Sequence, residues 1–233
     1  MLCLTASDFV PARPPVDLLP GEIQLWFAAP APAGARDWLL GLLAGYLHCA
    51  PAQVRLERGE HGKPFLPERP GLQFNLSHSG GALLLGIGHA QPLGVDIETA
   101  ARRRPVLELA RRYFSAAETA ALGRLDAARQ QEAFLNLWSC KEAVVKALGR
   151  GIGFGLARVA FDLDEDGEPT AMNVIDSSAG VADEWQIVRL RPAPAHSGAL
   201  AWRGPARPLR AFSSMASQPA DAFKVVAGPR YSG

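Results

Sequence analysis

The segment Trp138–Lys146 (WSCKEAVVK) lies near the end of a long run of residues with helical periodicity. We predict a helix over Ala127–Leu148, capped by Asp126 at its start and ended by Gly149. At about 100° per residue, its large apolar side chains fall on one stripe. They are Phe134, Leu137, Trp138, Val144, Val145 and Leu148.

Three polar residues in this segment need an explanation. Lys141 falls near the middle of the apolar stripe, so it either extends its stem along the core or needs a buried anionic partner. Glu142 and Lys146, four residues apart, lie at the edge of the stripe. Such a pair is either an ordinary ion pair on the helix surface or part of a site.

A second polar group stands in the segment Gly94–Glu98 (GVDIE), which reads as a strand. Because alternate residues of a strand share a face, Val95 and Ile97 point to the core, while Asp96 and Glu98 lie side by side on the other face. Two adjacent carboxylates are either a solvated surface or oxygen ligands for a cation such as Mg²⁺.

A third group consists of Gly62–Pro64 (GKP) and the segment Asn75–Gly80 (NLSHSG). We predict that residues 77–81 form a glycine-rich loop in which Lys63, Ser77 and His78 hold an anion. Together with the carboxylates, these residues describe a metal-assisted site for a pyrophosphate. The sequence contains no Walker A motif, no Rossmann GxGxxG motif and no kinase motif set.

The rest of the chain mixes helices and strands, which predicts an α+β fold. Ser115 and Glu118 have the spacing of a helix capping box. We predict further helices over Arg36–His48 and Arg102–Tyr113, and strands over Ile23–Ala29, Leu72–Leu76, Ala82–Gly88, Gly94–Glu98, Val159–Leu163, Trp185–Leu190 and Leu200–Trp202.

The composition narrows the class of protein. The 233 residues carry a net charge of +1, which argues against a nucleic-acid partner. Three scattered cysteines argue against a disulfide framework and a zinc site, and favour a reducing compartment. We find neither a secretory signal nor an apolar run long enough for a membrane span. We therefore expect a cytoplasmic protein that does not bind membranes.

Five motifs in this order resemble those of the 4′-phosphopantetheinyl transferases of the Sfp type. They are Gly62–Phe65, Phe74–Gly80, Gly94–Glu98, Phe114–Glu118 and Trp138–Lys146. The resemblance implies two similar α+β halves in a pseudo-two-fold arrangement within a monomer, with coenzyme A between them. We expect an N-terminal half at residues 1–100, a C-terminal half at 101–212 and a tail at 213–233.

The resemblance also implies the activity: the phosphopantetheine arm of coenzyme A is transferred to a serine of an apo acyl or peptidyl carrier protein, releasing adenosine 3′,5′-bisphosphate. It implies that Mg²⁺, or Mn²⁺ in its place, is bound by Asp96, Glu98 and Glu142. Asp96, Glu142 and Lys146 would be catalytic, with Glu142 or a water that it orients as the base. Coenzyme A would contact Lys63, Ser77, His78, Lys141, Lys146 and Arg36, of which Arg36 is the only basic residue in the region 28–38.

Two alternatives remain open from the sequence. The chain could be a non-catalytic module that binds coenzyme A or a nucleotide, or another Mg²⁺-dependent phosphotransferase or nuclease. A local run of basic residues could steer an acidic carrier protein to the site, or could be a solvated helix face. The run comprises Arg102, Arg103, Arg104, Arg111 and Arg112.

Overall fold

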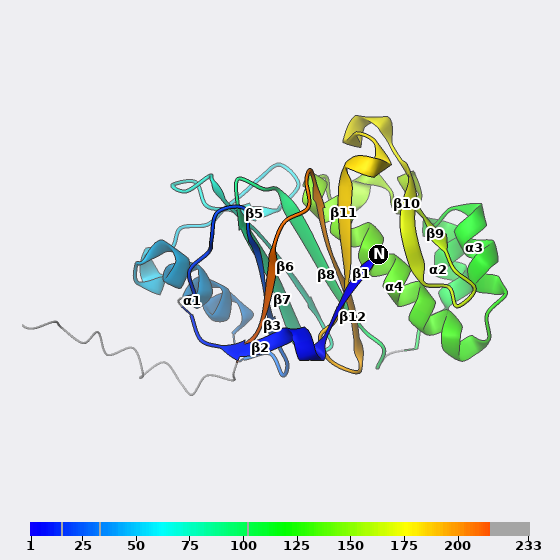
Figure 1. Cartoon of the computed structure of the whole chain (residues 1–233), viewed down its shortest axis with the longest axis horizontal. Coiled ribbons are helices and arrows are strands. Elements are labelled where there is room, and N and C mark those ends of the chain that lie inside the picture. Colours follow the sequence, from blue (N-terminus) through cyan, green and yellow to red (C-terminus); the bar gives the residue numbers. More distant parts are fainter. Residues whose placement is uncertain (15, 33, 102, 215–233) are drawn as a thin grey trace, which may run out of the picture.

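The computed structural model describes residues 1–14, 16–32, 34–101 and 103–214, and it confirms the predicted α+β class. Two β-sheets stack face to face at the centre, and a helix covers the outer side of each sheet (Figure 1). Helix α1 (Ala35–Leu47) packs on one sheet and the long helix α4 (Ala127–Leu148) on the other. Both helices match the predicted ranges to within one residue at each end.

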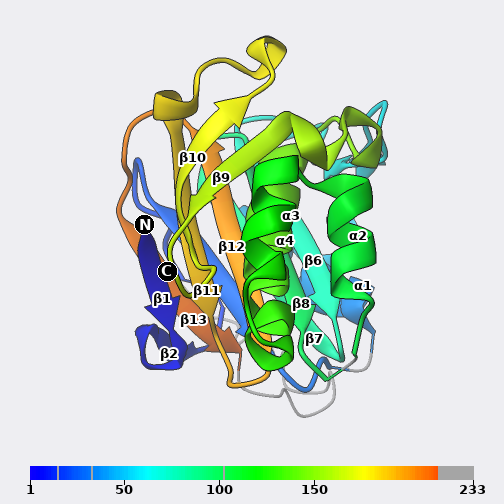
Figure 2. The same cartoon turned by 90° about the vertical axis from the view of Figure 1, so that its right-hand side faces the viewer.

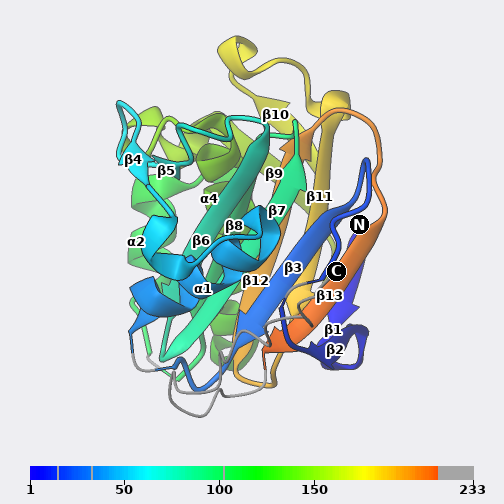
Figure 3. The same cartoon turned by 90° about the vertical axis from the view of Figure 1, so that its left-hand side faces the viewer.

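The five-stranded sheet has the order β2-β13-β3-β7-β6, and α1 lies across β3, β7 and β6 (Figure 3). The predicted loop over residues 77–81 is wrong, because Ser77, His78 and Ser79 continue the pairing with the next strand. Only Gly80 and Gly81, both at positive φ, form the turn. The strands are β2 (Phe9–Ala12), β13 (Leu209–Ser214), β3 (Ile23–Ala28), β7 (Ala82–His89) and β6 (Leu72–Ser79).

The four-stranded sheet has the order β1-β11-β12-β8. Each sheet takes strands from both sides of residue 100, so the two expected halves exchange strands: β13 joins the first sheet, and β1 and β8 join the second. The division of the chain at residue 100 stays a prediction, and of the expected tail only residues 213–214 are described. The strands are β1 (Leu2–Thr5), β11 (Trp185–Arg191), β12 (His196–Arg203) and β8 (Leu93–Thr99).

Strand β8 carries the predicted carboxylates, and both of its faces are covered. Val95 and Ile97 belong to the core between the two sheets, as predicted. The opposite face lies against α4, which approaches closely at Gly94. A Cβ atom at Gly94 would stand 2.1 Å from the carbonyl oxygen of Ala143 and 2.4 Å from the amide nitrogen of Ala147. Only glycine allows this contact, and the contact brings the α4 side chains over Asp96.

The remaining elements surround α4 on its outer side (Figure 2). The capping box of Ser115 and Glu118 is confirmed at the start of α3. The predicted helix over Arg102–Tyr113 is too long, because proline at position 105 disfavours helical backbone at the residue before it. The elements are α2 (Val106–Tyr113), α3 (Ala116–Gly123), β9 (Val159–Leu163) and β10 (Pro169–Ile175).

Short segments complete the described chain. A short hairpin pairs the two-residue strands β4 (Glu57–Arg58) and β5 (Pro64–Phe65). Each helix within the described ranges is too short or too polar to cross a lipid bilayer. Single 3₁₀ turns occur at Ala6–Asp8, Pro51–Gln53, Ile152–Phe154, Leu156–Arg158, Ser177–Ala179 and Ala182–Glu184.

Candidate active site

The candidate site lies where β6, the edge strand of one sheet, meets β8, the edge strand of the other. The alternate side chains of Asn75, Ser77 and Ser79 on β6 reach across to β8. These side chains form hydrogen bonds with backbone amides and a carboxylate on the edge of β8. Asn75 Oδ1 accepts from the Val95 amide at 2.8 Å, Ser77 Oγ accepts from the Ile97 amide at 3.3 Å, and Ser79 Oγ donates to Glu98 at 3.0 Å.

Three predicted site residues meet at this junction. Lys146, in the last turn of α4, places its Nζ 2.6 Å from Asp96 Oδ1 and 3.0 Å from Ser77 Oγ. Ser77 Oγ also donates to the same Asp96 oxygen at 3.0 Å. Asp96 is 4% exposed, so the alternative of a solvated carboxylate is wrong for this residue. Burial raises the pKa of Asp96, while the charge of Lys146 works in the opposite direction.

Glu142 completes the cluster from the preceding turn of α4. It makes no surface ion pair with Lys146, because the lysine is directed to Asp96 instead. The side chain is largely buried, and its burial together with the charges of Asp96 and Glu98 raises the pKa of Glu142 to about 7. The three carboxylates therefore act on one another electrostatically even though they come from two different elements.

Glu98 has a partner that we did not predict. Arg104 Nη2 lies 2.6 Å from Glu98 Oε2, and both side chains are largely buried. Arg104 belongs to the segment between β8 and α2, so it links the carboxylate strand to the basic run. Its own amide donates to Gln131 Oε1 on α4 at 3.3 Å, which anchors this segment to the helix.

The chemistry of the predicted metal ligands fits a divalent cation, but their arrangement is not that of a complete binding site. Asp96 Oδ2 is buried and has no hydrogen-bond partner among the described residues. Such an atom is a free ligand position for a hard cation. Within the described ranges, however, no three acidic, histidine or cysteine side chains come close enough to enclose a metal ion. Lys146 and Arg104 instead neutralise Asp96 and Glu98.

Lys141 does not join this cluster, and its contact with coenzyme A stays a prediction that its burial does not support. Its side chain is fully buried, with Nζ 2.8 Å from Glu118 Oε2 and 3.2 Å from the carbonyl oxygen of Leu156. It also donates to the Val159 carbonyl. Burial lowers the pKa of Lys141, and the Glu118 carboxylate opposes that shift. The alternative that Lys141 needs a buried anionic partner is confirmed.

The other predicted coenzyme A contacts are dispersed. Lys63 Nζ donates to the carbonyl oxygens of Leu93 and Lys146, each at 2.8 Å. His78 is exposed and, by strand alternation, stands on the opposite face of β6 from Ser77. Arg36 is exposed in the first turn of α1, on the outer side of the five-stranded sheet. The roles of these three residues toward a ligand stay predictions.

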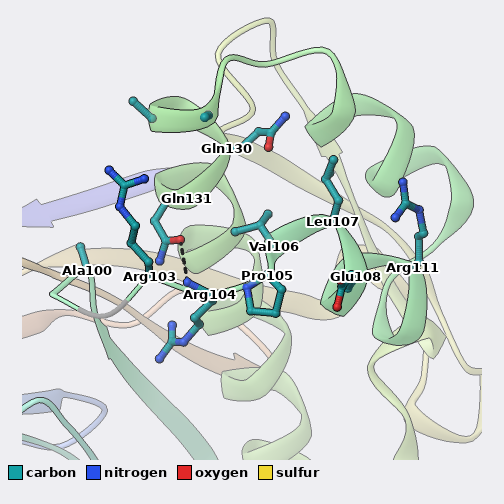
Figure 4. Close-up of a pocket in the computed structure, with 12 residues that line it drawn as sticks. Ala100, Arg103, Arg104, Pro105, Val106, Leu107, Glu108, Arg111, Gln130 and Gln131 are labelled. Carbon is teal, nitrogen blue, oxygen red and sulfur yellow. Dashed lines mark hydrogen bonds between the residues drawn. The ribbon is translucent and has the colours of Figure 1, made fainter.

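A hollow of about 540 Å³ lies between the segment around Arg104 and the first turn of α4 (Figure 4). Arg103 and Arg111 stand at opposite sides of it, and Glu108 is the acidic residue of its lining. The basic run therefore borders a depression that adjoins Glu98 through Arg104. Arg102 lies outside the described residues.

Sequence reasoning missed three contributors to the site: Asn75, Ser79 and Arg104. A signal for the first two was present, because polar residues at positions 75, 77 and 79 alternate as residues on one face of a strand do. Interpreting residues 77–81 as a loop hid that pattern. The pairing of Arg104 with Glu98 joins two elements through a turn, and no local pattern predicts it.

Comparisons with known proteins identify the family. The profile of the 4′-phosphopantetheinyl transferase superfamily matches residues 92–196, which contain β8 and α4. The chain is 41% identical over 119 residues to 4′-phosphopantetheinyl transferase psf-1 of Bacillus pumilus, covering 51% of this chain and 49% of that protein. It is 36% identical over 118 residues to Sfp of Bacillus subtilis, covering 50% and 51%.

A third relative is covered more completely. The chain is 37% identical over 142 residues to 4′-phosphopantetheinyl transferase AcpT of Escherichia coli, covering 55% of this chain and 71% of AcpT. The two Bacillus proteins are matched over only about half of their length.

Proposed function

Because the chain belongs to the 4′-phosphopantetheinyl transferase superfamily, we propose that it transfers the phosphopantetheine arm of coenzyme A to a serine hydroxyl of an apo carrier protein. The observation that supports this proposal most directly is the meeting of Asp96, Ser77 and Lys146 in one buried cluster with Glu142 beside it. These residues come from three motifs that are separated in the sequence. A shared site explains why each of the three motifs contains polar residues.

The reaction breaks the P–O bond between the phosphorus that bears the pantetheine arm and the bridging oxygen of the pyrophosphate. The serine oxygen bonds to the phosphorus that bears the pantetheine arm, adenosine 3′,5′-bisphosphate leaves with the bridging oxygen, and the serine proton passes to a base. Both reactants carry or develop negative charge near the phosphorus. The site therefore has to supply positive charge at fixed positions.

Lys146 is the residue best placed to supply such charge. Its ammonium is part-exposed and is held by Asp96 and Ser77, so it is oriented before any ligand arrives. A fixed cation of this kind stabilises charge on the leaving oxygen without reorganising during the reaction. Ser77 Oγ accepts a hydrogen bond from Lys146 and donates one to Asp96, and these bonds hold the Lys146 side chain against Asp96.

Glu142 is proposed as the group that accepts the serine proton, directly or through a water that it orients. A carboxylate whose pKa is raised to about 7 accepts a proton more readily than an ordinary glutamate. Its position one helical turn before Lys146 places base and cation on the same side of α4.

Asp96, Glu98 and Glu142 would hold Mg²⁺, or Mn²⁺, and the bound ion would offset the charge of the pyrophosphate oxygens. The unpartnered Oδ2 atom of Asp96 supports this assignment. Glu98 would have to exchange Arg104 for the ion, and Asp96 offers its free oxygen while Oδ1 stays on Lys146.

The carrier protein is proposed to approach over the hollow bordered by Arg103, Arg104 and Arg111. A surface rich in arginine attracts an acidic partner and orients it before contact. The proposal extends to a monomeric enzyme of the cytoplasm, in keeping with the sequence.

One assay tests the proposed function. The purified protein is incubated with coenzyme A, MgCl₂ and an apo carrier protein, and the carrier is weighed by intact-mass spectrometry. We expect a mass gain equal to phosphopantetheine, its loss with EDTA, and no gain on a carrier whose modified serine is replaced by alanine. Binding of coenzyme A without any mass gain on a panel of apo carriers would favour a non-catalytic module. Phosphoryl transfer to a different acceptor would favour another phosphotransferase.

A further inference from the structure

Lys63 lies on the turn of the β4–β5 hairpin, far from α4 in the sequence but in contact with it in space. Its Nζ donates to the carbonyl oxygen of Leu93 at 2.8 Å and to that of Lys146 at 2.8 Å. Leu93 is the first residue of β8, and Lys146 lies in the last turn of α4. One ammonium group therefore ties the hairpin to the start of the strand and to the end of the helix.

These two elements carry the candidate site. Asp96 follows Leu93 by three residues on β8, and the helix residue whose carbonyl Lys63 binds is Lys146 itself. The strand and the helix already touch through their backbones at Gly94. The contact at Gly94 brings them together, and the bonds of Lys63 fix how far one slides along the other.

The position of Lys63 is also favourable electrostatically. The last carbonyl groups of a helix lack partners within the helix and carry partial negative charge, so a cation at this end is stabilising. The Lys63 side chain is part-buried, and burial lowers its pKa to about 8. Two of its three N–H groups are committed to carbonyl oxygens, which leaves little of the ammonium to face a phosphate.

The hairpin itself is built to present this lysine. The Gly59 amide donates to the Lys63 carbonyl at 3.0 Å, and the Gly62 amide donates to the Gly59 carbonyl at 2.9 Å. Gly62 has a φ of 79°, a conformation that suits glycine. Arg58 donates to the Gly62 carbonyl at 2.9 Å from an exposed position. The turn is therefore held by its own bonds, and Lys63 is free to extend toward α4.

We propose that Lys63 is a positioning residue: it fixes β8 against α4 and thereby sets Asp96 relative to Lys146 and Glu142, instead of binding a phosphate of coenzyme A. This inference rests on the proposed function, because it concerns the geometry of that same site. It replaces the predicted role of Lys63 with one that its hydrogen bonds support.

The test separates positioning from phosphate binding. Lys63→Met removes the donors but keeps the stem, and Lys63→Arg restores two donors and the charge. Arg55→Met is the control, since it removes an exposed cation two residues before the same hairpin, where it faces Glu68 and not β8 or α4. For each protein we would measure kcat and KM, and, with the metal chelated, the Kd values of coenzyme A and of 3′-dephospho-coenzyme A by calorimetry.

We expect Lys63→Met to lower kcat by about 10- to 100-fold, the scale of a small misplacement of reacting groups. Both Kd values should stay within about threefold of wild type, which is about 0.7 kcal/mol. Lys63→Arg should recover most of kcat, and Arg55→Met should match wild type. The proposal is overturned if Lys63→Met leaves kcat intact. It is also overturned if Lys63→Met raises the Kd of coenzyme A by more than tenfold while the Kd of 3′-dephospho-coenzyme A is unchanged.

A second measurement uses the wild-type chain, in case Lys63→Met fails to fold. The protein has four lysines, so reductive methylation of each can be followed by peptide mass spectrometry. We expect Lys63 to react more slowly than in the unfolded chain and at the same rate with and without saturating coenzyme A. Strong protection of Lys63 by coenzyme A would overturn the proposal. Absence of any transfer by wild type would instead refute the proposed function, and the binding and labelling results would still decide the position of Lys63.

Discussion

Helix α4 carries two lysine–carboxylate pairs five residues apart, and they differ in every property that matters for function. Lys141 and Glu118 are 0% and 1% exposed at their side chains, whereas Lys146 and Asp96 are 27% and 6% exposed. Both oxygens of Glu118 are bonded, because Oε1 accepts from the Phe161 amide and Oε2 from Lys141 and the Ser115 amide. Asp96 keeps one oxygen unpartnered.

The difference separates a pair that holds the fold from a pair that can meet a ligand. The Lys141 pair joins α4 to α3 and β9, and both of its side chains are buried. The Lys146 pair stands at the edge of two sheets with a free acceptor and a part-exposed donor. Full satisfaction of its polar groups therefore favours a structural role for the first pair, and incomplete satisfaction makes the second the candidate site.

The largest effect should follow from breaking the buried pair. Lys141→Met leaves the Glu118 carboxylate buried without its cation, which costs about 3–5 kcal/mol of folding free energy. Lys146→Met, the matched change in the other pair, also leaves a buried carboxylate, but Lys146 is part-exposed and Asp96 has a raised pKa and can take up a proton, so we expect a smaller loss than at Lys141. Urea unfolding of both variants measures the contrast. Equal losses, or a larger loss at Lys146, would show that burial does not distinguish the two pairs.

The next effect concerns activity. Lys146→Ala should lower the transfer rate by at least ~100-fold, the scale for removing one contact made in the transition state. Its fold should persist, as the near-UV circular dichroism spectrum would report. Initial rates of carrier modification at saturating coenzyme A measure the loss. A folded Lys146→Ala protein with a rate within threefold of wild type would remove Lys146 from the mechanism.

A third lysine, Lys63, extends the comparison to pH. Its pKa is lowered to about 8 in the folded state, and the ordinary value near 10.5 applies when the chain unfolds. The unfolded state therefore binds more protons between these values, and stability from this group rises with pH, by about 2 kcal/mol between pH 7.5 and 9.5.

Lys63→Arg is the control for this pH effect, because arginine keeps its proton throughout. Urea unfolding of both proteins across that pH range isolates the contribution of Lys63. The difference in stability between wild type and Lys63→Arg should move in favour of wild type as the pH rises. A difference that is flat with pH would contradict the burial of the Lys63 ammonium.

The smallest effect should come from the exposed arginines of the hollow. Arg103→Gln with Arg111→Gln should slow association with an acidic carrier several-fold at low salt and leave the rate at saturating carrier unchanged. Stopped-flow measurements at two salt concentrations give the association rate constant and its salt dependence. If the association rate and its salt dependence match wild type, the arginines are a solvated surface and the carrier binds elsewhere.

The sequence allowed the helix and the two lysine environments to be anticipated in part. The 3.6-residue period placed Lys141 inside the apolar stripe and Lys146 at its edge, and the capping box placed Glu118 at the start of a helix. What period and spacing do not contain is the partner across space. Glu118 precedes Lys141 by 23 residues, and only the packing of α3 against α4 joins them.

The prediction of the site from the sequence was limited in the same way. The alternation in GVDIE put Asp96 and Glu98 on one face, but the side-chain contact of Ser77 with Asp96 depends on two sheets meeting at their edges. The exchange of β13 and β1 between the sheets has no local signal, because each strand is short and pairs with residues far along the chain. Lys63 was assigned to a phosphate from its motif, whereas its hydrogen bonds are to backbone carbonyls.

The most direct test of the account is the transfer rate of an Asp96→Ala variant, measured by intact mass of an apo carrier with coenzyme A and Mg²⁺. Asp96 is the residue in which the proposed metal, Lys146 and Ser77 meet. We predict a folded protein whose rate falls by at least ~100-fold relative to wild type. Modification of the carrier at a rate near that of wild type would contradict the assignment of this cluster as the active site.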